Sequence, residues 1–130
     1  MFKEICIIIF IIIVVILADF GVQKYLDNSS NELISILEDI YAIISDRDNI
    51  NQENLKKEIE KLENSWSNIQ EKWTIIVVHS ELDMVDLALN DFKTAIDSNN
   101  INDAYLKVRE LEYLFSHIAE RDSFKIKNIF

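Results

Sequence analysis

The chain opens with a long hydrophobic segment. Every residue from Ile5 to Ala18 is apolar, and Phe20 and Val22 extend the apolar character past Asp19. A membrane-spanning helix needs about 20 largely apolar residues. A core helix of a soluble bundle would have a polar face, and this segment has none. The pattern therefore predicts a transmembrane helix within residues 1–25 that crosses the lipid bilayer through residues 5–22.

The same segment has features of a secretory signal sequence. A signal peptidase could use Ile16-Leu17-Ala18, but the weak cleavage pattern and the long hydrophobic region favour an uncleaved signal anchor. Lys3 precedes the segment and Lys24 follows it, so the flanking charges are nearly even. A short tail before a first hydrophobic helix usually stays in the cytosol. We expect a single-pass protein of the cell membrane with residues 26–130 outside the cytoplasm.

Amphipathic segments follow the membrane helix. Ser29 and Glu32 have the spacing of a capping box, which predicts a helix from Ser30 to Ser45. Its expected core residues recur at helical spacing: Leu33, Leu37, Ile40 and Ile44. The polar run at 46–49 predicts a turn, because it lacks the glycine and closing glutamate of a calcium loop.

The clearest periodicity lies in the next segment, where apolar residues alternate in steps of four and three. These residues are Leu55, Ile59, Leu62, Trp66, Ile69, Trp73 and Ile76. Such a seam predicts a long helix that packs against a partner helix, with both tryptophans in the core rather than on a sugar-binding surface. The phase changes after the five β-branched residues at 74–78, which predicts a kink or break near His79.

Two more helices complete the expected bundle. Their apolar series are Val78, Leu82, Val85, Leu89, Phe92 and Ile96, and then Ala104, Val108, Leu111, Phe115 and Ile118. Asp97–Asn100 forms the turn between them, and Asn100 or Asn102 caps the last helix. That helix is expected to end near Arg121, with an extended tail at 123–130. The fold class is all-α: a transmembrane helix, then a small antiparallel bundle of about four helices, one of them long, at 26–130.

Composition restricts the chemistry. The 130 residues carry a formal net charge of −10, which disfavours binding to nucleic acid and to anionic lipid headgroups. Cys6 is the single cysteine and lies in the apolar segment, which excludes an internal disulfide and a cysteine-based zinc site. The sequence has no proline, one glycine and no phosphate loop, nucleophile elbow or His-Glu-x-x-His motif. We expect a protein that is not an enzyme and uses no cofactor or small-molecule substrate.

The two histidines are the best candidates for metal binding. If the last two helices form an antiparallel hairpin, His79, Asp83, His117 and Glu120 lie at the same end of the bundle. The helical wheel opposes a shared site, because His117 lies roughly 140° from Ala104, the middle of its apolar stripe. A structural histidine at a helix junction is the favoured interpretation, with His117 contacting a third helix. Asp83 or Glu81 is expected to cap the helix that starts there.

These residues together resemble a family of small bacterial membrane proteins, the domain of unknown function 4363 family. The resemblance covers nearly the whole chain. It lies in the apolar N-terminus, Trp66 and Trp73, and the segments at 79–83, 111–118 and 124–130. It implies a membrane-anchored helical protein of Gram-positive bacteria and assigns no activity.

Two functions remain open. The first is an interaction module in which the anchored bundle presents an acidic helical surface to another membrane or envelope protein, or to a second copy of the chain. The alternative is a small-ligand or metal sensor that uses the end of the bundle with His79 and His117.

Overall fold

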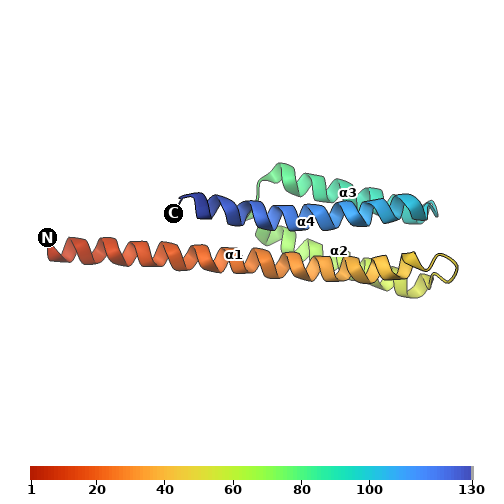
Figure 1. Cartoon of the computed structure of the whole chain (residues 1–130), viewed down its shortest axis with the longest axis horizontal. Coiled ribbons are helices and arrows are strands. Elements are labelled where there is room, and N and C mark those ends of the chain that lie inside the picture. Colours follow the sequence, from red (N-terminus) through yellow and green to blue (C-terminus); the bar gives the residue numbers. More distant parts are fainter. Residues whose placement is uncertain (130) are drawn as a thin grey trace.

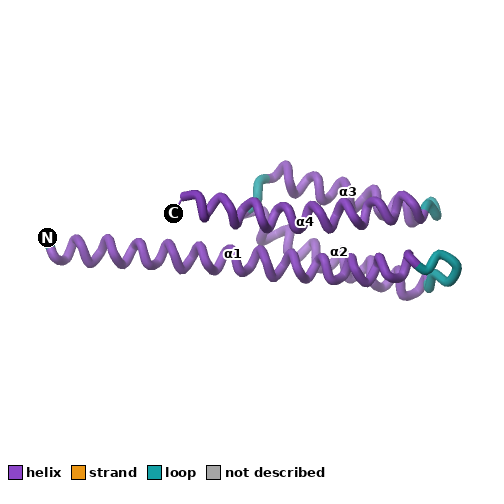
Figure 2. The backbone as a smooth tube through the Cα atoms, in the orientation of Figure 1, coloured by secondary structure: helices purple, strands orange, loops and turns teal. Residues whose placement is uncertain are grey.

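Four helices build the molecule. The computed structural model describes residues 1–129, with side chains described as far as Arg121, and these residues contain no strand. The helices are α1 (Phe2–Ser45), α2 (Gln52–Ile76), α3 (His79–Asp97) and α4 (Ile101–Ile129). Short connections join them, and the N-terminal part of α1 extends beyond the other three helices (Figures 1 and 2). The predicted all-α fold is confirmed.

The core lies among the second half of α1 and the other three helices. α1 packs against α2 and α4, and α3 packs against α4, whereas α2 and α3 contact each other at few positions. The predicted core residues of α1 are all fully buried: Leu33, Leu37, Ile40 and Ile44. Trp66 and Trp73 are buried as well, with an edge-to-face contact between rings whose centroids lie 5.8 Å apart. Their predicted role in the core is confirmed.

The predicted break near His79 is also confirmed. α2 ends at Ile76 and α3 begins at His79, with Val77 and Val78 in extended conformation between them. β-branched residues favour an extended backbone, which explains why the helix stops in this run. The predicted side-chain cap is wrong, because no side chain caps the N-terminus of α3. The Glu81 carboxylate instead accepts a hydrogen bond from Arg121 of α4.

The predicted helix start at Ser30 is wrong. α1 continues without interruption from Phe2 to Ser45, because the serine hydroxyls find partners that do not require a helix end. Ser29 Oγ donates to the carbonyl of Tyr25 (2.6 Å) and accepts from Trp73 Nε1 (2.9 Å). Ser30 Oγ donates to the carbonyl of Phe115 on α4 (2.9 Å). These serines join helices rather than begin one.

The predicted extended tail is wrong as well, since residues 123–129 continue α4. No glycine or proline follows Gly21, and a short alternating run cannot persist as a strand without a partner strand. The expected packing of this segment on the bundle lies outside the described side chains.

The turn before α4 follows the prediction. Asn99 adopts a left-handed conformation (φ 56°), which asparagine tolerates better than most residues. Asn100 Oδ1 then accepts a hydrogen bond from the backbone amide of Asp103 (3.3 Å), so Asn100 is the predicted cap. Asn51 caps α2 in the same way, through the amide of Asn54 (3.1 Å).

Candidate functional site

The apolar segment at 5–18 of α1 is exposed and does not pack against the described part of the bundle. Residues 1–18 are exposed, and none of the most apolar 18-residue window is buried. Among the described residues, one helix is long and apolar enough to cross a membrane or to act as a signal sequence, and it is this one. Leu26 is the first fully buried residue, so the bundle begins where the apolar segment ends.

The histidine end of the bundle has the predicted topology. α3 and α4 form an antiparallel hairpin, and the ion pair between Glu81 and Arg121 places the start of α3 beside the late part of α4. His79, Asp83 and Glu120 are nevertheless exposed. Among the described side chains, which end at Arg121, no group of three or more histidine, cysteine, aspartate or glutamate residues could hold a metal ion. The hairpin therefore places the four candidate residues at the same end of the bundle, but it does not bring their side chains together into one site.

His117 differs from the prediction. It is exposed and stacks on the ring of Tyr113 one turn earlier in α4, with centroids 5.4 Å apart and an angle of 13° between the rings. The expected contact with a third helix is not among the contacts of the described side chains, and a side chain this far from the apolar stripe reaches solvent. The expected hydrogen bond of His79 to the segment after Arg121 lies outside the described side chains.

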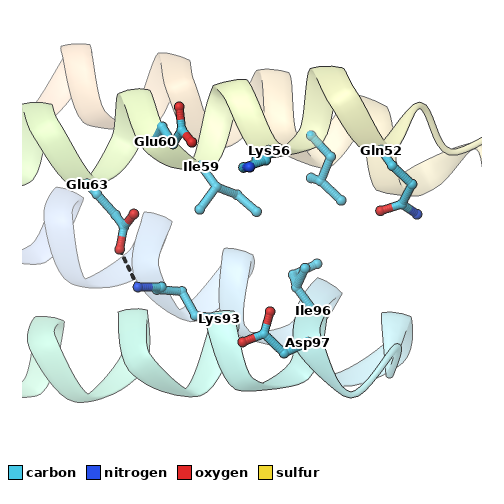
Figure 3. Close-up of a pocket in the computed structure, with 9 residues that line it drawn as sticks. Gln52, Lys56, Ile59, Glu60, Glu63, Lys93, Ile96 and Asp97 are labelled. Carbon is cyan, nitrogen blue, oxygen red and sulfur yellow. Dashed lines mark ion pairs between the residues drawn. The ribbon is translucent and has the colours of Figure 1, made fainter.

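A groove lies between the start of α2 and the end of α3. Its floor is apolar, with Leu55 and Ile59 from α2 and Ile96 from α3. In Figure 3, Ile59 and Ile96 point toward one another across the groove. Leu55 is buried, but Ile59 and Ile96 are only partly covered, because α2 and α3 pack so little against each other. This is the part of the α2 seam that the chain itself leaves accessible.

Charged side chains form the rim of the groove. They are Lys56, Glu60, Glu63, Lys93 and Asp97. Glu63 and Lys93 form an ion pair across it (Figure 3), and the hydrogen bond with Glu63 raises the pKa of Lys93 above its ordinary value. The apolar floor with charges on both sides matches the shape and chemistry of an amphipathic helix.

Asp86 closes the gap between α2 and α3 further along. Its two carboxylate oxygens accept hydrogen bonds from Trp66 Nε1 and from Gln70 Nε2, both at 2.7 Å. Sequence reasoning missed this pair of contacts, because Asp86 is one of many exposed carboxylates. The signal that could have pointed to it is the buried Trp66, whose N–H needs an acceptor.

A second polar cluster joins α1 to α4. Tyr41 and Tyr105 share a hydrogen bond between their hydroxyls, and Arg109 donates to Tyr41 (3.0 Å) while its guanidinium lies over the Tyr41 ring, 4.3 Å from its centroid. The hydrogen bond to Tyr41, together with one to Glu112, raises the pKa of Arg109 above its ordinary value. Tyr41 bonds to both Tyr105 and Arg109, so the cluster connects the two helices.

Comparison with known proteins gives one match. Residues 20–129 match the model of a family described as domain of unknown function (DUF4363). No curated protein and no solved structure matches the chain. The matched region covers the bundle and leaves out nearly all of the exposed apolar part of α1.

Proposed function

The chain belongs to the DUF4363 family, which has no assigned activity, and from its geometry we propose that it is a membrane-anchored helical module that binds another membrane or envelope protein. It acts by binding rather than by catalysis. The observation that carries the proposal is the segment at 5–18 of α1, which is apolar throughout and has no residue buried against the described part of the chain. Such a surface requires either lipid or protein to cover it.

The bilayer is the partner that fits this surface. Residues 5–22 form a helix about 27 Å long, close to the roughly 30 Å of a hydrocarbon core. The segment is apolar on every side, whereas a protein-binding helix needs only one apolar face. The bundle then lies outside the cytoplasm, as expected for a signal anchor with a short N-terminal tail.

The continuity of α1 supports the proposal that the anchor is retained. The best cleavage position, after Ala18, lies in the middle of α1 rather than in a loop. Proteases cut exposed loops in preference to helices, because the chain must be extended in the protease active site. An uncleaved helix also carries the anchor directly into the bundle.

The groove of α2 and α3 is the surface for the protein partner. α1 rises about 40 Å from Asp19 to Ser45, so the groove lies at the end of the bundle that is far from the bilayer. An amphipathic helix of another envelope protein, or of a second copy, would cover Ile59 and Ile96. The net charge of −10 of the chain favours a partner with basic residues.

The test is recovery of the partner from native membranes with the intact protein as bait. Ile59→Asp places a charge on the floor of the groove, and we expect it to abolish recovery while circular dichroism reports an unchanged helical content. Leu106→Asp is the matched control, because Leu106 is an exposed apolar residue of α4 away from the groove. Recovery that survives Ile59→Asp and fails with Leu106→Asp would place the binding surface elsewhere.

A further inference from the structure

The connection between α2 and α3 exposes large apolar side chains. Ile75 is 89% exposed and Val78 is 49% exposed, whereas Val77 between them is 5% exposed and belongs to the core. In the β-branched run, Ile76 and Val77 therefore pack against the bundle, whereas Ile75, in the last turn of α2, and Val78 face outward. The extended backbone explains why β-branched residues occur here, but it does not require the outward-facing residues to be apolar.

Side-chain contacts show which residues of α1 lie beside this connection. Trp73 Nε1 donates to Ser29 Oγ (2.9 Å), and the ammonium of Lys72 lies 5.6 Å from the centroid of the Tyr25 ring. Because α1 and α2 are antiparallel, the residues after Trp73 lie level with positions of α1 that precede Ser29. Ile75 and Val78 are therefore level with about residues 21–25 of α1. Figure 1 shows the connection on the side of the bundle from which the first half of α1 extends.

The dimensions of a bilayer then place the connection at the lipid surface. The helix from Ile5 to Val22 is about 27 Å long, close to a hydrocarbon core of roughly 30 Å, so the edge of the core lies near Val22. The connection then lies within about 5 Å of the edge of the core. The interfacial layer of headgroups is roughly 5–7 Å thick on each side, so Ile75 and Val78 fall inside it.

We propose that the α2–α3 connection lies in the interfacial layer of the bilayer and forms a second, apolar attachment of the bundle to lipid. This inference rests on the proposed function, because it requires α1 to span the membrane. The contact comes from Ile75 and Val78 rather than from charge, since a chain with a net charge of −10 gains nothing from anionic headgroups. Two attachments fix the angle between the bundle and the membrane, which one helix alone would leave free.

The test measures the depth of a fluorescent label in vesicles. The full chain carries Cys6→Ser and either Ile75→Cys or Val78→Cys, labelled with a polarity-sensitive fluorophore. Asn64→Cys is the matched control, an exposed position on α2 about 16 Å farther from the membrane. The proteins are reconstituted in vesicles of phosphatidylcholine and phosphatidylglycerol that contain nitroxide-labelled phosphatidylcholine as quencher. Vesicle flotation reports whether each protein is anchored, and circular dichroism reports its fold.

The expected result is strong quenching at positions 75 and 78 and background quenching at position 64. Omission of phosphatidylglycerol is expected to leave the quenching unchanged. Proteins that float with the vesicles but show no more quenching at 75 and 78 than at 64 would overturn the inference and leave the anchor intact. Proteins that do not float would overturn both.

Discussion

Trp73 shows how single residues hold this bundle together. Its side chain is fully buried, and its ring meets Trp66 and Phe115 edge to face, the second at 6.3 Å between centroids. Its N–H reaches Ser29 in the middle of α1. One side chain of α2 thus contacts both α1 and α4, and it satisfies its own polar atom while doing so.

Trp73→Ala is expected to lower the free energy of unfolding by about 3–5 kcal/mol, through lost burial and a residual cavity. The measurement is denaturant unfolding of the detergent-solubilised chain, followed by circular dichroism. Leu106→Ala, at an exposed position, should change the same free energy by less than about 0.5 kcal/mol. Similar stabilities for both variants would show that the tryptophan does not anchor the core.

The histidines are expected to behave as surface residues. His79→Gln and His117→Gln should keep the thermal midpoint and the partner recovery of the unchanged protein, because both side chains are exposed. Calorimetric titration with zinc should give the same heats for the variants as for the unchanged chain. Saturable zinc binding that either substitution removes would support the sensor instead.

At the scale of elements, α1 is the unexpected feature. The sequence predicts an anchor and a separate first helix of the bundle, but the structure joins them into one helix of 44 residues. In the proposed function, a tilt of the anchor would be transmitted directly to the bundle, because no flexible linker lies between them. Gly21 lies where the apolar segment meets the bundle, and a glycine lowers the stability of a helix interior.

Gly21→Ala is expected to raise the free energy of unfolding by about 0.5–1 kcal/mol, since glycine is that much worse than alanine inside a helix. A Cβ atom at this position would meet nothing within 4 Å, so no clash opposes the gain. Gly21→Pro should lower stability instead, because proline breaks a helix interior. Thermal unfolding in detergent compares the two, and equal midpoints would contradict a continuous α1.

Periodicity predicted the helices well, and local signals predicted their ends less well. The apolar series of α1 and α4 are buried as expected, because core packing enforces a helical repeat. The break at Val77–Val78 and the cap at Asn100 also follow from local preferences. The predicted helix start at Ser30 is wrong because serines can form tertiary hydrogen bonds as well as helix caps. The positions of Trp73 and Phe115 in space decide between these two roles, and the sequence does not show them.

The site was less predictable than the fold. A helical wheel gives the direction of a side chain, but it does not tell how far apart two helices lie. The groove with Ile59 and Ile96 exists because α2 and α3 pack little against each other, a property of the whole arrangement. The hairpin predicted that His79 and Glu120 lie at the same end of the bundle. Their exposure depends on the neighbouring helices and could not be predicted in the same way.

At the scale of the whole molecule, the proposed function requires the first half of α1 to lie in a bilayer and the bundle to lie outside the cytoplasm. The proposed roles of the groove and of the α2–α3 connection both depend on this orientation. The same helix could serve as a signal sequence, in which case the bundle would be released from the membrane after cleavage near Ala18.

The most direct measurement combines membrane fractionation with protease treatment of intact cells. The full-length chain is expected to stay in the membrane fraction after a carbonate wash, and protease added outside the cell is expected to remove the bundle. A mature protein that begins at Asp19 and leaves the membrane would contradict the anchor, and a bundle protected until the cells are lysed would contradict the orientation.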